Sequence, residues 1–157
     1  MKVRLIKQRG TMELKSRGRL QRLMGLAQEL AGLGIDKGTL NVVITGSDEM
    51  AKMNEQFLGH HGHTDVLTFD LRDDCAFAVD DEACVAEVYV CPEVAVEFSA
   101  KFGTTPSYEL VLYIVHGMLH LAGEDDLEDE ARASMRAAEK RVIDGIKERF
   151  SVEGFIS

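Results

Sequence analysis

The stretch Glu109–Leu121, ELVLYIVHGMLHL, decides the fold of this chain. It is apolar on nearly every side, and a helix of that kind is usually central and buried. Two histidines, His116 and His120, interrupt the apolar run. We therefore expect a central buried helix around which the remaining segments pack, and we expect both imidazoles to be buried with it.

The segments around this helix predict a mixed architecture. Short β-branched runs indicate strands in the first part of the chain, and helical spacing dominates the last part. The predicted strands cover residues 3–7, 39–45, 65–70 and 84–90, and the predicted helices cover residues 16–31, 47–57, 92–102, 106–121 and 127–149. This order predicts an α+β fold in one domain, residues 1–157, with a roughly four-stranded mixed sheet and about five helices.

Composition indicates an ordinary globular protein. The 157 residues are 45% apolar and 29% charged, and no run approaches the roughly 18 apolar residues that span a membrane. The first residues, MKVRLIKQRG, lack the apolar block of a signal peptide. The three cysteines (Cys75, Cys84 and Cys91) are odd in number and lack CxxC spacing. We therefore expect reduced thiols in a cytoplasmic protein.

Charge is distributed unevenly along the chain. The net charge of −9 argues against indiscriminate binding to nucleic acid. Residues 1–22 nevertheless carry eight basic side chains and one acid, a net charge of +7, which leaves −16 for the remaining residues. This basic segment, in which Lys2 and Arg4 are candidate substrate-binding residues, could attract a polyanion. The alternative is an ordinary solvated surface.

The two histidines have the spacing of metal ligands. Residues four apart lie on one face of a helix, about 5–6 Å apart at Cβ, and two imidazoles so placed can bind one ion. An imidazole buried without partners would cost about 1–3 kcal/mol. Gly123 ends the helix and lets the chain turn back, so that Asp126 can supply a third ligand in the pattern H-x3-H-x5-D.

Other interpretations of these residues are possible. An isolated HxxxH pattern is common, and Asp126 could instead be the N-cap of the last helix. Zinc proteases of the HExxH type carry a glutamate after the first histidine as general base. Gly117 occupies that position here and cannot take a proton. It would allow another backbone or a substrate to approach the ion closely.

Four segments together resemble one known family. The segment HGMLHLAGEDD (116–126) is similar to the H-G-x-L-H-L-x-G-x-D-H signature of the YbeY family of metal-dependent endoribonucleases. The segment MNEQFLGHHGHTDVLTF (53–69) resembles the family block N-x-x-[YF]-R-G-x-x-x-x-T-D-V-L-S-F. AEVYVCPEVA (86–95) and ARASMRAAEKRV (131–142) resemble its G-D-I-x-I step and its E-x-x-x-M-x-x-x-E tail. The resemblance covers roughly residues 40 to 145.

The resemblance implies a function. It implies an α+β fold with the metal site at the end of the histidine helix, and one Zn²⁺ ion held by His116, His120 and Asp126 with a position left open for water or a phosphate oxygen. It also implies cleavage of single-stranded RNA in rRNA maturation and in quality control of the small ribosomal subunit, with rRNA and that subunit as partners.

The chain departs from the family pattern at two important positions. Asp126 stands where the family has a third histidine, and a carboxylate ligand could shift the preference toward harder divalent ions. Leu58 stands where the family has an arginine, and leucine can hold neither a phosphate nor developing negative charge. Three histidines follow, and one of them could supply a cation or a ligand, although they could equally be incidental residues of a polar loop: His60, His61 and His63.

The catalytic group and the activity stay open at this level. Glu124 and Asp125 are candidate proton relays because they lie beside the proposed ligand in the sequence. The two departures from the family pattern keep open a ribosome-assembly factor with weak or absent catalysis. A metallohydrolase acting on peptides or small molecules is a third, less favoured interpretation.

Overall fold

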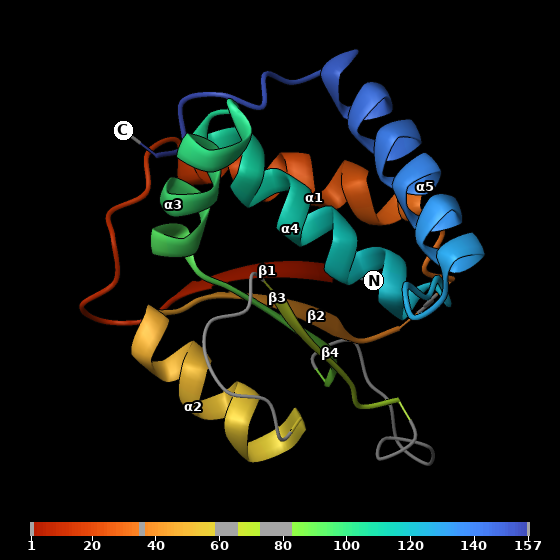
Figure 1. Cartoon of the computed structure of the whole chain (residues 1–157), viewed down its shortest axis with the longest axis horizontal. Helices are drawn as coiled ribbons and strands as arrows, with labels where there is room; N and C mark the ends of the chain where they lie inside the picture. Colours follow the sequence, from red (N-terminus) through yellow and green to blue (C-terminus); the bar gives the residue numbers. More distant parts are fainter. Residues whose placement is uncertain (1, 35–36, 59–65, 73–82, 157) are drawn as a thin grey trace.

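The computed structural model describes residues 2–34, 37–58, 66–72 and 83–156. In this part of the chain one four-stranded sheet carries helices on both faces (Figure 1). Helix α2 (Ser47–Leu58) lies on one face, and the other helices gather on the opposite face. The predicted α+β fold with a mixed sheet is confirmed.

The sheet places β3 at an edge. The strand order is β1-β2-β4-β3; the first three strands in this order run parallel, and β3 is antiparallel to β4. The strands are β1 (Lys2–Lys7), β2 (Thr39–Ile44), β3 (Val66–Asp70) and β4 (Cys84–Val90). Their positions match the four predicted strands to within one residue at each end.

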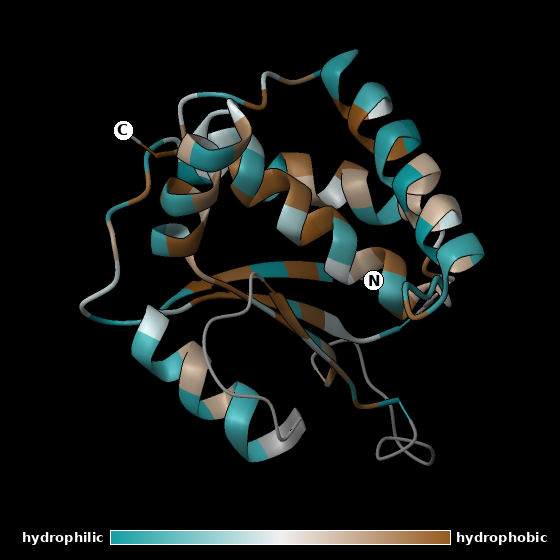
Figure 2. Cartoon of the chain, viewed as in Figure 1, coloured by the Kyte–Doolittle hydropathy of each residue, from teal (hydrophilic) through white to brown (hydrophobic). Residues whose placement is uncertain are grey.

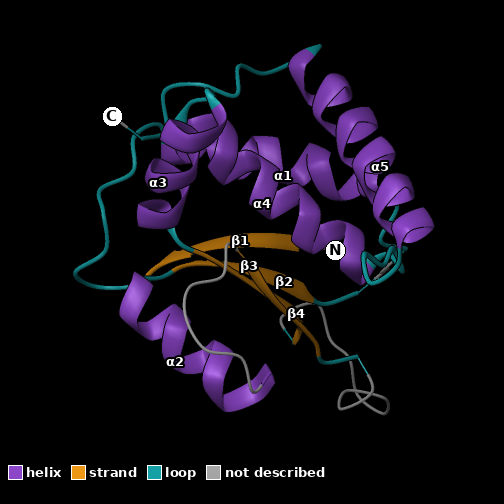
Figure 3. Cartoon of the chain, in the orientation of Figure 1, coloured by secondary structure: helices purple, strands orange, loops and turns teal. Residues whose placement is uncertain are grey.

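The helices, which are purple in Figure 3, also begin and end close to their predicted limits. Those not yet named are α1 (Arg17–Ala31), α3 (Pro92–Phe102), α4 (Pro106–Leu121) and α5 (Asp129–Lys147). The last helix is two residues shorter at each end than predicted. At its start Glu128, with an extended backbone, is the N-cap residue, so the residues before it are free to turn toward α4.

Helix α4 is the centre of the fold, as predicted. Eleven of its 16 residues are buried, and it packs against α1, α3, α5, β3 and β4. The hydropathy view shows hydrophobic residues along this helix (Figure 2). The prediction that both imidazoles are buried is wrong, because the side chains of His116 and His120 are 21% and 31% exposed. They lie at the edge of the core, where solvent or a substrate can reach them.

Gly117 does not face the two histidines' ligand nitrogens. A Cβ atom added there would lie 2.6 Å from Val88 Cγ1 and 3.2 Å from Thr68 Oγ1 and Val66 Cγ2. The glycine therefore lets the helix pack closely on side chains of β3 and β4. The prediction that it admits a backbone or a substrate to the ion is corrected: the close approach is to the sheet.

Two of the three cysteines lie in the part of the chain that the structure describes. Cys84 is half-buried and Cys91 is buried, both as free thiols, and burial raises the pKa of the Cys91 thiol. Cys75 lies outside the described residues. None of the helices in the described part of the chain is both long and apolar enough to cross a membrane.

Candidate metal centre

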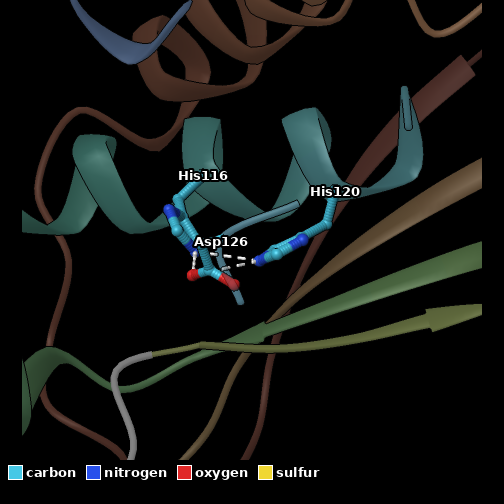
Figure 4. Close-up of side chains that lie close together, drawn as sticks. All are labelled: His116, His120 and Asp126. Atoms are coloured by element: carbon cyan, nitrogen blue, oxygen red, sulfur yellow. Dashed lines mark hydrogen bonds and ion pairs between the residues drawn. The ribbon is translucent and has the colours of Figure 1, made fainter. Parts of the chain in front are cut away.

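The turn after α4 brings a third side chain back to the histidine pair. Gly123 adopts a left-handed conformation (φ 102°), which glycine accepts most easily. Its N–H donates to the His120 carbonyl (3.1 Å), and the Glu124 N–H donates to the Leu119 carbonyl (2.9 Å). These two bonds form a Schellman motif that reverses the chain. Asp126 consequently lies opposite the two imidazoles (Figure 4).

Three potential ligand atoms form a compact triangle. The Nε2 atoms of His116 and His120 lie 3.0 Å apart. Asp126 Oδ2 lies 3.3 Å from His116 Nε2 and 3.7 Å from His120 Nε2. These are the residues predicted to bind metal, and within the described part of the chain they form the one such group of His, Cys, Asp and Glu side chains.

The opposite nitrogen of each ring sets the tautomer. His116 Nδ1 lies 3.4 Å from Glu139 Oε1, and His120 Nδ1 lies 3.1 Å from the Glu124 carbonyl oxygen. A backbone carbonyl and an ionised carboxylate can accept a hydrogen bond but cannot donate one. Each Nδ1 therefore carries the hydrogen. In neutral rings both Nε2 atoms then present lone pairs toward each other and toward a carboxylate oxygen. A divalent ion placed between these three atoms would accept an electron pair from each of them.

The triangle has the size of a tetrahedral zinc site. With ligand bonds of about 2.0–2.1 Å, tetrahedral ligand atoms lie about 3.3 Å apart, close to the three observed separations. A position about 2 Å from all three atoms lies just outside their plane. Three protein ligands on half-exposed side chains also leave room for a further ligand from solvent or substrate. The donor set therefore fits a catalytic divalent ion.

Asp126 is not the N-cap of the last helix. That alternative is wrong because Glu128 occupies the N-cap position. Asp125 has a local role instead: its Oδ1 accepts a hydrogen bond from the Leu127 N–H (2.7 Å) in a turn. The Glu124 carboxylate accepts from the Ser134 hydroxyl (3.2 Å). The main-chain carbonyl of Glu124 thus hydrogen-bonds a proposed ligand, His120. The carboxylates of Glu124 and Asp125 instead bond Ser134 and the Leu127 N–H.

Glu139 is a site residue that the sequence reasoning missed. It comes from α5, 23 residues after His116, and its side chain is only 16% exposed. A carboxylate on the outer nitrogen of a ligand histidine fixes the ring and makes it a stronger donor. The sequence carries one signal for it, because Glu139 is the final glutamate of the segment that resembles the family's E-x-x-x-M-x-x-x-E tail.

An ion pair fixes the end of α4 beside the sheet. Arg72 donates from Nε to Asp70 Oδ1 (2.8 Å) and from Nη2 to Asp70 Oδ2 (2.5 Å). Nη2 also donates to the Leu121 carbonyl oxygen (2.8 Å), one of the last carbonyls of the helix. Hydrogen bonding to Arg72 lowers the pKa of the Asp70 carboxyl. The histidine-bearing end of α4 is therefore tied to the residues that follow β3.

The predicted substrate-binding residues lie apart from this group. Lys2 and Arg4 are exposed on β1 and alternate with buried Val3, so they point away from the sheet face that carries α4. β1 is also the sheet edge opposite β3. Arg19, another basic residue of the segment, hydrogen-bonds carbonyls of the C-terminal tail at Ser151 and Glu153.

The remaining predicted substrate-binding residues follow α2 in the sequence. His60, His61 and His63 lie outside the described residues. Leu58 is the last residue of α2.

A cavity of about 650 Å³ opens beside the ligand residues. It lies between α3, α4 and α5, and His116 and Asp126 form part of its wall. Glu139 lines it as well, so the partner of His116 is shared between the cavity and the ligand group. No pattern within a single segment predicts this cavity, because its walls come from three helices and two loops.

Comparison with known proteins identifies similar sequences. A family model described as Endoribonuclease YbeY matches residues 6–147. A Thermotoga maritima protein named Endoribonuclease YbeY is 33% identical over 128 residues, 81% of this chain and 80% of that protein. A Salinibacter ruber protein of the same name is 35% identical over 109 residues, 68% of this chain and 69% of that protein.

A solved structure has a similar fold. The solution structure of a Thermotoga maritima protein is similar with a TM-score of 0.57 and 28% sequence identity. The similarity covers 93% of this chain and 92% of that one. The match therefore extends over both the sheet and the histidine helix.

Proposed function

This chain belongs to the YbeY endoribonuclease family, and from that premise we propose that it is a metal-dependent hydrolase that cleaves phosphodiester bonds of single-stranded RNA. The observation that carries the proposal is the convergence of His116 Nε2, His120 Nε2 and Asp126 Oδ2 within 4.8 Å of one another. The names of the relatives supply the reaction, and this group of atoms supplies the place where it would occur.

We propose that these three residues hold one divalent ion. A bound ion of this kind supplies a Lewis acid for a phosphoryl oxygen and lowers the pKa of bound water. Glu139 and the Glu124 carbonyl hold the rings with Nε2 directed at the ion site. The half-exposed position of the ligands lets solvent and an RNA backbone reach the site.

Zinc is the ion that the donor set favours. Two imidazoles and one carboxylate are common zinc ligands. A carboxylate in place of a third imidazole reduces the net positive charge at the site and favours harder ions such as manganese more than three histidines would. We therefore expect Zn²⁺ to bind most tightly, with Mn²⁺ as the alternative.

We propose that a carboxylate beside the ion site relays a proton during cleavage. Of the two predicted carboxylates, Glu124 is favoured over Asp125, because its carbonyl already contacts His120 and its side chain is half-buried. Asp125 is exposed and engaged in a turn. Glu124→Gln should then lower the cleavage rate without loss of the ion, and an unchanged rate would exclude Glu124 as the relay.

The cellular role follows from the family alone. We propose that the substrate is rRNA, that the chain acts in the cytoplasm during maturation and quality control of the small ribosomal subunit, and that the basic residues Lys2 and Arg4 with His60, His61 and His63 contribute RNA contacts. Co-sedimentation of the protein with small ribosomal subunits tests the partner. Absence from that fraction at low salt would contradict it.

Cleavage of a labelled single-stranded RNA by the purified protein tests the activity. We expect cleavage after addition of Zn²⁺ or Mn²⁺, loss of cleavage with a chelator, and little cleavage of a fully paired duplex. Casein serves as a parallel substrate for the peptide-hydrolase interpretation. RNA that stays intact under every metal condition while the protein binds the small subunit would favour an assembly factor without catalysis.

A further inference from the structure

The cavity beside the ligand group shares its wall with that group. His116 and Asp126, two of the three ligand residues, line it together with the His116 partner Glu139. A group held in the cavity would therefore lie directly beside the ion site. Its volume of about 650 Å³ falls within the roughly 300–1,000 Å³ of typical small-molecule sites.

Aromatic rings form much of the cavity wall. Phe98 and Phe102 come from α3, with ring centroids 5.7 Å apart, and Tyr108 and Tyr113 come from α4. Phe102 is 68% exposed, although large apolar side chains are usually covered. An exposed ring that borders a site for RNA chemistry offers a stacking surface for an unpaired base.

Polar groups in the cavity suit a base rather than an aliphatic side chain. The Glu109 carboxylate is buried and accepts a hydrogen bond from the Thr104 hydroxyl at 2.6 Å. Both residues line the cavity. A carboxylate has several acceptor sites and can take further hydrogen bonds from the amino or imino groups of a nucleobase.

Arginines supply the complementary charge for an adjoining phosphate. Arg132 and Arg136 lie four residues apart on α5, hence on one face, and both line the cavity. Arg132 is bonded to Asp129. Arg136 is exposed, and within the described residues no hydrogen bond or ion pair engages it. A guanidinium group binds phosphate oxygens in pairs, so Arg136 offers a phosphate contact at the rim of a cavity that Glu109, Asp126 and Glu139 also line.

We propose that this cavity binds one unpaired nucleobase of the RNA, from a nucleotide next to the cleaved bond, and so positions the phosphodiester at the ion site. The inference rests on the proposed function and adds a base subsite to it. Phe102 stacks on the base, Glu109 accepts from its polar edge, and Arg136 contacts the neighbouring phosphate. Because a duplex cannot release a base without unpairing, the cavity also accounts for selection of single strands.

A scan of base-free nucleotides combined with Phe102 variants tests the proposal. Each position of a short single-stranded RNA is replaced in turn by an abasic ribonucleotide, and cleavage is measured as kcat/KM with wild type and Phe102→Ala. Phe102 is exposed, so its loss should leave the fold intact. We expect one position beside the cleaved bond where removing the base lowers kcat/KM about tenfold or more, the size of one lost stacking contact.

The double change identifies the contact. If the base stacks on Phe102, Phe102→Ala lowers kcat/KM about tenfold for intact RNA and has no further effect on the RNA that lacks this base. Phe102→Tyr should restore most of the rate, because it keeps the ring. Val96→Ala is the matched control: Val96 is exposed on the same helix and does not line the cavity.

Two outcomes overturn the inference. The first is wild-type cleavage whose kcat/KM is unchanged by an abasic nucleotide at every position. The second is a Phe102→Ala variant that lowers kcat/KM by the same factor whether or not the base is present. Either would leave the nuclease activity itself established. If the wild type cleaves no intact RNA but hydrolyses casein, the proposed function fails first, and the aromatic cavity is assigned to a peptide side chain.

Discussion

Two neighbouring residues of α4 face opposite environments. Gly117 lies against β3 and β4, where no space remains for even one more carbon atom. His116, one residue earlier, is 21% exposed and lies beside an open cavity. Because neighbouring residues of a helix point about 100° apart, one element can pack tightly on one side and carry chemistry on the other. Residues on the sheet side therefore keep α4 in place, and residues on the cavity side are the proposed metal ligands.

The two sides should respond differently to substitution. On the sheet side, a change alters the free energy of unfolding through packing. On the ligand side, a change alters metal affinity and cleavage while the fold without metal stays nearly as stable, since half-exposed polar side chains contribute little to the core.

His120→Ala should have the largest effect on activity. It removes one of the three proposed ligand atoms, so we expect RNA cleavage to fall to the background rate and Zn²⁺ binding to be lost. The melting temperature of the metal-free protein should change by no more than about 2 °C. Calorimetric metal titration beside a cleavage assay measures both. Wild-type cleavage by this variant would refute a metal mechanism at this site.

Gly117→Ala should have the largest effect on stability. The added methyl would meet Val88 Cγ1 at 2.6 Å, and valine is too stiff to turn aside. We expect a loss of about 1–3 kcal/mol in the free energy of unfolding, measured in urea. Gly25→Ala is the matched control within α1, where a Cβ meets nothing within 4 Å; it should stabilise by up to about 1 kcal/mol. Equal effects of the two substitutions would contradict the packing argument.

Glu139→Ala tests whether the ligand side extends to α5. Loss of its carboxylate frees the His116 ring, and outer partners of this kind typically change metal affinity by about 10–100-fold. Glu139→Gln keeps an acceptor oxygen and should recover part of the affinity. Glu130→Ala, an exposed glutamate on the same helix, is the control. If Glu139→Ala binds Zn²⁺ as tightly as wild type, the carboxylate does not position His116.

The pair Asp70–Arg72 gives the smallest predicted effect. The pKa of Asp70 is lowered below its ordinary 3.8 by Arg72, so its contribution to stability is full above the unfolded-state pKa and is lost as pH falls through the folded-state pKa. Both side chains are more than a third exposed, which limits the contribution to about 0–1 kcal/mol. Unfolding of wild type and Asp70→Asn should therefore differ at pH 7, and the difference should shrink as pH falls below 3.8. A difference that stays constant as pH falls below 3.8 would exclude this cause.

The sequence predicted the frame of the site because that frame is local. The spacing of His116 and His120, the break at Gly123 and the return of Asp126 lie within 11 residues, so helix geometry and one turn bring them together. The order of strands and helices was readable for the same reason, since periodicity within each segment is a local property.

The remaining features depend on contacts between distant segments. Glu139 reaches His116 from another helix, and the cavity wall combines residues from α3, α4 and α5. Its place directly after His116 in the sequence predicts that Gly117 opens space beside the ion, whereas its environment is set by Val88 and Thr68 of two strands. No pattern within a single segment carries this information.

Metal stoichiometry of the purified protein tests the central claim most directly. We measure zinc per chain for wild type, Asp126→Ala and Asp125→Ala after equilibration with excess ion and removal of the unbound fraction. The account predicts one ion per chain for wild type and for Asp125→Ala, because Asp125 lies in a turn outside the ligand triangle. Asp126→Ala should retain far less than one. Equal zinc in both variants, or none in wild type, would contradict a centre built from His116, His120 and Asp126.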